Sequence, residues 1–81
     1  MDLKKELLEI IFELSAVTAD EIISANNWKA AGIDSLDTIE ILMEISDRYG
    51  ITIEEDDEEN LTDFHLLLKY VSDKISAKNG L

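Results

Sequence analysis

The sequence predicts an all-α fold: a four-helix bundle with three major helices, one short helix and a long first loop. Of the 81 residues, 46% are hydrophobic and only 6% are aromatic, so Leu and Ile must supply most of the core, which favours packed helices over a sheet. The apolar residues also recur at spacings of three and four, the period of a helix. A chain of this length can build one core, and we expect residues 1–81 to form a single domain.

The first helix is indicated by apolar residues that share one helical face, while Lys and Glu occupy the rest of the wheel. These apolar residues are Leu3, Leu7, Ile10, Ile11 and Leu14.

Residues 15–33 form the long first loop, because the helical period fades there into Ser, Thr and Asn. A connection this long is either functional or anchored by its own side chains. We expect Trp28 and Ile33 to be the anchors. Thr18 and Glu21 have the spacing of a capping box, which predicts one helical turn near residues 19–23.

The second helix is predicted to begin at Asp34, a good N-cap residue, and to end at Tyr49, where Gly50 suits a left-handed C-cap. On a helical wheel its acids fall in one quadrant, and Leu36 and Met43 lie on the edge of that quadrant. Apolar residues beside an acidic stripe suggest a binding surface, although isolated exposed apolar residues are ordinary. The expected core residues are Ile39, Leu42, Ile45 and Tyr49, with Ile41 at the margin.

The last part of the chain is predicted to contain a short helix and a long one. Residues 51–53 alternate like a strand but have no partner strand, so they are expected to be extended loop. The acidic run 54–59 is expected to hold the short helix. The last helix follows a cap at Thr62 or Asp63 and frays at Asn79 and Gly80. Its apolar face comprises Phe64, Leu67, Leu68, Val71 and Ile75.

Charge and composition restrict the function. The chain has 19 acids and 7 bases, a formal charge of −12, which excludes nucleic acid, argues against anionic membranes and indicates partners with basic patches. With no Cys, the chain itself supplies no disulfide, thiolate ligand or thiol nucleophile. The N-terminal segment has neither the apolar run of a signal peptide nor a membrane span, so we expect a cytoplasmic protein that does not insert into membranes.

Catalytic and metal sites are not predicted. The only histidine, His65, would have to serve Ser35 from a distant helix, so we expect a partly exposed helical residue instead. The acidic run 54–59 lacks the Gly and terminal Glu of an EF-hand loop, which leaves a solvated charge run with loose divalent binding at most.

Ser35 is the residue with the most informative setting. It is expected at the first helical position, where backbone N–H groups and the helix dipole favour an attached phosphate. Position alone favours an ordinary helix-start serine, because Ser is common in first helical turns for reasons unrelated to modification. Residues 32–40, Gly-Ile-Asp-Ser-Leu-Asp-Thr-Ile-Glu, resemble the phosphopantetheine attachment motif of acyl carrier proteins. The preceding helix, the long loop, the exit at residues 49–51 and the Leu61-Thr62 start of the last helix extend the resemblance over nearly the whole chain.

The resemblance implies a non-enzymatic carrier. Its cofactor would be 4'-phosphopantetheine, transferred from coenzyme A to Ser35 by a phosphopantetheinyl transferase, with Asp34 and Leu36 flanking the site. Acyl groups would be held as thioesters and presented, by a monomer, to loading, condensing and acyl-transfer enzymes of fatty-acid or related biosynthesis. The partner-binding face would consist of Asp37, Glu40, Met43, Glu44 and Asp47.

Departures from the family pattern leave the pathway open. The chain has Ala30-Ala31 where fatty-acid carriers have an acid and Leu, it has Arg48 near the helix end, and it lacks a Pro after Ile53. An amino-acid or peptidyl carrier, or an unmodified acidic interaction domain, are the alternatives.

Overall fold

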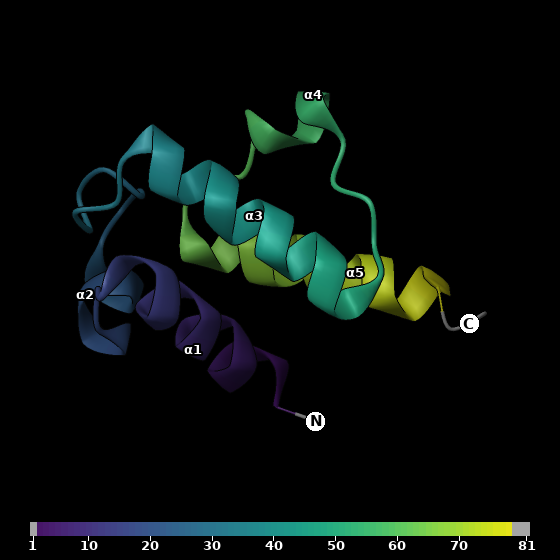
Figure 1. Ribbon diagram of the computed structural model, residues 1–81, viewed down its shortest axis with the longest axis horizontal. Coiled ribbons are helices and arrows are strands. Elements are labelled where there is room, and N and C mark those ends of the chain that lie inside the picture. The colour runs from purple at the N-terminus through teal and green to yellow at the C-terminus, as the bar shows by residue number, and fades with distance from the viewer. Residues whose placement is uncertain (1, 79–81) are drawn as a thin grey trace.

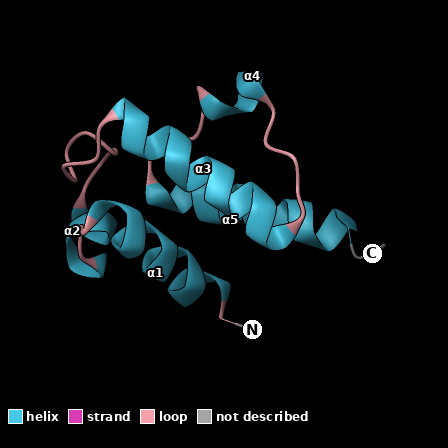
Figure 2. Cartoon of the chain, viewed as in Figure 1, coloured by secondary structure: helices cyan, strands magenta, loops and turns pink. Residues whose placement is uncertain are grey.

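The computed structural model describes residues 2–78, and these are all helix, turn or loop (Figures 1 and 2). The three long helices are α1 (Leu3–Ser15), α3 (Ser35–Tyr49) and α5 (Phe64–Lys78), and the two short ones are α2 (Ala19–Ser24) and α4 (Glu55–Glu58). The all-α prediction is confirmed. The helical turn expected inside the first loop is a helix of its own, so the described chain has two short helices instead of one.

The core lies where α1 meets the other helices. Helix α1 contacts α3 and α5, and α2 packs against α1 and α5. In Figure 1, α1 runs antiparallel to α3, and the chain passes over α4 before it descends to the start of α5. Leu7, Ile10, Ile45, Leu67 and Val71 have no exposed surface, so the three long helices share one apolar interior.

Local capping sets the ends of the short and long helices as expected. The Thr18 hydroxyl accepts a hydrogen bond from the Glu21 amide at 3.4 Å and starts α2. Gly50 ends α3 with φ 63° and ψ 37°, a left-handed conformation that suits glycine. Asp63, rather than Thr62, caps α5, because its Oδ1 accepts from the Leu66 amide at 2.9 Å. The fraying expected at Asn79 and Gly80 lies outside the described residues.

Two core predictions were wrong. Ile39 is 48% exposed, whereas Ile41 is only 1% exposed. The buried stripe of α3 is turned towards α1, which places Ile41 inside it and leaves Ile39 about 120° from Ile45 around the helix. Leu14 is 37% exposed, because α1 ends one residue later and the chain leaves through Ala16, which has φ 61°. Leu68, Ile75 and Tyr49 pack against the core while partly buried.

Tyr49, the last residue of α3, joins that helix to the first turns of α1. Its hydroxyl donates a hydrogen bond to Glu6 Oε1 at 2.9 Å. Burial, followed by the hydrogen bond and charge of Glu6, raises the pKa of Tyr49 from 10.0 to about 12. The folded state therefore favours the neutral phenol.

This shift predicts alkaline destabilisation. Between pH 10 and 12 the unfolded chain loses the Tyr49 proton while the folded chain keeps it, so the stabilisation present below pH 10 is lost as the pH rises to about 12. Chemical denaturation at several pH values should show a steeper alkaline fall in the free energy of unfolding for the parent than for Tyr49→Phe. Lysine deprotonation is common to both proteins, so identical slopes would contradict the prediction.

Candidate functional site

The start of α3 is a well-formed helix N-terminus. Asp34 has an extended backbone, φ −83° and ψ 178°, and its Oδ1 accepts a hydrogen bond from the Asp37 amide at 2.9 Å. Its carbonyl oxygen accepts from the Thr38 hydroxyl at 2.9 Å and from the Thr38 amide at 3.0 Å. The carboxylate of Asp34 thus acts as the N-cap that the sequence predicted.

The first loop holds this helix end in place. Trp28 is 8% exposed, its indole Nε1 donates to the Leu61 carbonyl at 2.6 Å, and its amide donates to the Thr62 carbonyl at 3.2 Å. The Ile33 amide donates to the Trp28 carbonyl at 2.9 Å, and Ile33 is 2% exposed. Gly32, with φ 89°, provides the left-handed turn between them. Both predicted anchors are confirmed, and they fix the residues directly before Asp34.

Ser35 is exposed and occupies the first position of α3. The first amides of a helix have no carbonyl partner within it, and the helix dipole places partial positive charge there. A phosphate ester on the Ser35 hydroxyl would be stabilised by both effects. The site therefore suits a phosphate-linked group on an accessible oxygen.

A pocket of about 260 Å³ lies beside Ser35. Its apolar lining comes from Ile39 and Leu42, and its opposite side comes from Glu58 and Glu59 at the end of α4. Helix α4 has no buried residue, and Asp57 Oδ2 accepts a hydrogen bond from the Tyr70 hydroxyl at 2.8 Å, which attaches α4 to α5. Burial and this hydrogen bond raise the pKa of Tyr70. Sequence reasoning missed Glu58 and Glu59, because only the return of the chain through α4 brings them to Ser35. It missed Ile39, on the same helix as Ser35, because it assigned that residue to the core.

The face expected to bind partners lies on the exposed side of α3. Leu36 is 71% exposed and Met43 is 62% exposed, as their places on the wheel indicated. Glu40 and Asp47 are exposed, and Asp37 and Glu44 are partly buried. The acidic side chains and the two apolar ones thus form one continuous surface leading from Ser35. The one basic residue of α3 is Arg48, whose guanidinium lies 3.4 Å from the Glu44 carboxylate and 3.9 Å from the Glu13 carboxylate.

The acidic residues between Asp34 and Asp63 repel one another, which predicts that cations stabilise the folded state. From Asp34 to Asp63 there are 12 acids and only Arg48 opposes them. Folding concentrates these charges, so bound or screening cations should favour the folded state. Thermal melts in low-salt buffer should show a higher midpoint with millimolar calcium or magnesium, and a smaller rise with monovalent salt at equal ionic strength. An unchanged or lower midpoint would show that repulsion does not limit stability.

Within residues 2–78, no three His, Asp or Glu side chains are arranged to hold a metal ion. No helix in the same range is long and apolar enough to cross a membrane. His65 is exposed and its ring lies 6.1 Å from that of Phe64, so it is an ordinary helical residue on α5.

Comparison with known proteins agrees with this geometry. A family model described as "Phosphopantetheine attachment site" matches residues 5–71. The chain is 32% identical over 75 residues to acyl carrier protein 4, chloroplastic, of Arabidopsis thaliana, covering 91% of this chain and 55% of that protein. It is 34% identical over 64 residues to acyl carrier protein 1, chloroplastic, of Spinacia oleracea, covering 73% of this chain and 46% of that protein.

A shorter match is to acyl carrier protein 2, chloroplastic, of Arabidopsis thaliana, with 46% identity over 44 residues. It covers 54% of this chain and 32% of that protein. The chain thus spans about half the length, or less, of these relatives. The family match covers the first loop, the whole of α3 and the start of the last helix. The chain therefore belongs to the acyl carrier protein family, whose cofactor is covalently attached 4'-phosphopantetheine.

Proposed function

We propose that residues 1–81 act as one acyl carrier domain in which Ser35 holds 4'-phosphopantetheine. The observation that carries this proposal is the exposed serine at the first position of α3, beside a partly apolar pocket and inside the span of the family match. The cofactor supplies the thiol that the chain lacks, since the sequence has no Cys. Acyl groups are then held as thioesters.

The protein's own residues present the cofactor and do not transform the cargo. When a phosphopantetheinyl transferase acts on coenzyme A, the hydroxyl oxygen of Ser35 attacks the phosphorus next to the pantetheine and the pyrophosphate bond breaks. Adenosine 3',5'-bisphosphate leaves, and the hydroxyl proton passes to a base of the transferase. Asp34 fixes the helix end through its hydrogen bond to the Asp37 amide. Leu36, at 71% exposure, offers apolar contact next to the reacting oxygen.

The proposed partners are the transferase and the loading, condensing and acyl-transfer enzymes of fatty-acid or related biosynthesis. The relatives named above support the fatty-acid assignment, because they are acyl carrier proteins. The acidic surface of α3 supports basic docking patches on the partners. A monomeric state and a cytoplasmic location stay predictions.

Incubation with coenzyme A and a broad-specificity phosphopantetheinyl transferase tests the proposal. Intact-mass measurement should show the addition of one phosphopantetheine unit per chain. Fragmentation of the product should place that unit on the peptide that contains Ser35. A chain that gains no mass under conditions that load a known carrier would instead favour an unmodified acidic interaction domain.

A further inference from the structure

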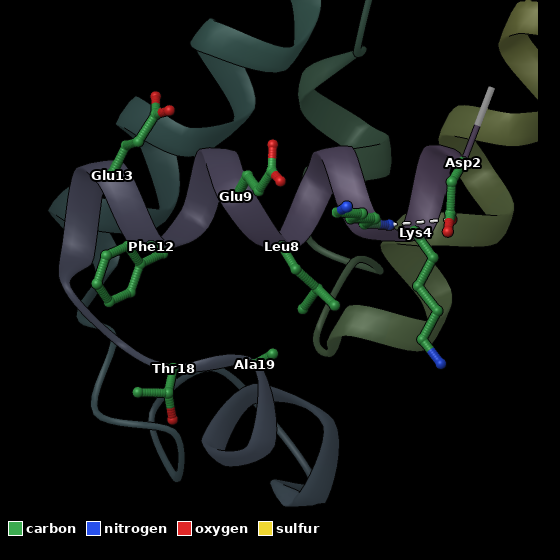
Figure 3. A pocket seen from close by; sticks show the side chains of 9 residues that line it. Asp2, Lys4, Leu8, Glu9, Phe12, Glu13, Thr18 and Ala19 are labelled. Atoms are coloured by element: carbon green, nitrogen blue, oxygen red, sulfur yellow. Dashed lines mark hydrogen bonds between the residues drawn. The ribbon is translucent and has the colours of Figure 1, made fainter.

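A second pocket, of about 620 Å³, lies between α1 and α2 and shares no lining residue with the pocket beside Ser35. Figure 3 shows Leu8 and Phe12 on α1 pointing towards the start of α2, where Thr18 and Ala19 form the other wall. We call this feature the α1–α2 groove. It belongs to neither the proposed attachment site nor the acidic surface of α3.

The floor of the α1–α2 groove is unusually apolar for an exposed surface. Phe12 is 52% exposed, although Leu7, Ile10 and Ile11 on the same helix are completely buried. Leu8, one turn before Phe12, is partly buried and packs against the core. A large aromatic side chain that projects into a groove is a potential anchor for a partner. Ala19 keeps the opposite wall low, so a docked backbone can approach closely.

The charges around the groove are divided between its two ends. Glu9 and Glu13 lie on α1 near Phe12, and Asp2 and Lys4 lie at the end near the N-terminus (Figure 3). Lys5 also lines that end. Glu13 is 3.9 Å from Arg48, and both side chains are well exposed, so that pair is weak and Glu13 stays available. Acids therefore border the half of the groove around Phe12, and Figure 3 shows the carboxylates of Glu9 and Glu13 on the side of α1 away from α2.

A second helix can lie along the α1 wall of the groove. Residues 4–13 of α1 span about 14 Å at 1.5 Å per residue, which leaves room beside them for two to three turns. Amphipathic helices bind such grooves with apolar residues spaced three and four apart. Leu8 and Phe12 have the matching spacing of four. A membrane surface or a second copy of this chain would have to overcome the charge of −12, whereas a basic segment is attracted by it.

We propose that the α1–α2 groove docks a basic amphipathic helix of a partner protein, with apolar side chains on Leu8 and Phe12 and Lys or Arg side chains beside Glu9 and Glu13. This surface goes beyond the carrier role of Ser35. It leaves α3 free, so a partner held at the groove and an enzyme acting on the cofactor can bind the same carrier together.

The test uses a synthetic helical peptide of about 18 residues with Leu on one face and Lys on the other, long enough to be partly helical alone. Its affinity is measured by calorimetry and its position by amide chemical-shift mapping of the full chain. The expected shifts include residues 4–19. Phe12→Ser should weaken binding about tenfold or more, because it removes the central anchor. Leu66→Ser, at a similarly exposed position on α5, is the matched control and should leave the affinity unchanged.

A double variant, Glu9→Gln with Glu13→Gln, tests the charge assignment. It should lower the affinity for the peptide several-fold and reduce the dependence of that affinity on salt. Equal binding of a peptide with Glu in place of Lys would overturn the proposal. The proposal would also be overturned if the peptide changed chemical shifts only in α3, or if Phe12→Ser bound the peptide as tightly as the parent. It would likewise be overturned if a fatty acid, dodecanoate, changed the chemical shifts of the groove residues and the peptide did not.

The transferase assay separates this proposal from the carrier role. Phe12→Ser should gain one phosphopantetheine unit at the parent's rate, because Phe12 lies outside the pocket beside Ser35. Failure of the parent to load would contradict the carrier role and leave the peptide result standing. Slow loading of Phe12→Ser would show that the transferase itself binds the groove. It would overturn the proposal that the groove is a docking surface independent of loading.

Discussion

Replacement of Ser35 with alanine is expected to abolish attachment of phosphopantetheine while the protein stays folded. The hydroxyl oxygen is the only atom of Ser35 that the transfer uses, and no other serine combines the first position of a long helix with an Asp-Ser-Leu setting. Asp34 still caps α3 in the variant, and alanine is a good helix former, so the free energy of unfolding should change little. Intact mass after the transferase reaction gives the loading, and circular dichroism checks the fold.

Ser72→Ala is the matched control for this variant. Ser72 is exposed on α5, and its replacement changes the mass and side-chain chemistry in the same way as Ser35→Ala. It should load as the parent does. If Ser35→Ala still acquired one unit, or if Ser72→Ala failed to do so with its fold intact, the assignment of the attachment site would be wrong.

The second large effect is expected from charge reversal on α3. Glu40→Lys and Glu44→Lys should each slow loading by about tenfold, because each replaces an attraction to a basic enzyme surface by a repulsion close to Ser35. Added salt should reduce the difference in loading rate between the parent and these variants, since it screens exposed charges. Met43→Ala removes apolar contact area instead, so its smaller loss of rate should depend little on salt.

Asp73→Lys provides the control for net charge. Asp73 is exposed on α5, and its reversal changes the overall charge by the same two units without touching α3. The initial rate of loading at several salt concentrations is the measurement. If Asp73→Lys slowed loading as much as Glu40→Lys, the effect would belong to the total charge of the protein. If none of the variants slowed it, the α3 surface would have no part in recognition.

What could be predicted from the sequence depends on how far apart the interacting residues are. The caps at Thr18 and Asp34 join residues three apart, and the apolar period of α1 repeats every turn. Such features need only the local chain, and they were predicted correctly apart from Leu14 at the end of α1. The exposed positions of Leu36 and Met43 followed from the wheel for the same reason.

The rest depended on where distant segments meet. Whether Ile39 or Ile41 is buried depends on the side from which α1 approaches α3, and the wheel alone does not contain that direction. The hydrogen bond from Tyr49 to Glu6 joins residues 43 positions apart. The pocket beside Ser35 needs Glu58 and Glu59 from a four-residue helix with no buried face, so no periodicity marked them.

The hydrogen bond from Trp28 to the Leu61 carbonyl has a practical consequence for spectroscopy. Trp28 is the sole tryptophan, so the whole indole emission comes from the junction between the first loop and the segment before α5. An indole buried to 8% exposure emits at shorter wavelengths than one in water, and separation of the two segments would shift the emission to the red. The protein thus carries its own fluorophore for following, on the stopped-flow timescale, any opening of the loop that positions Ser35.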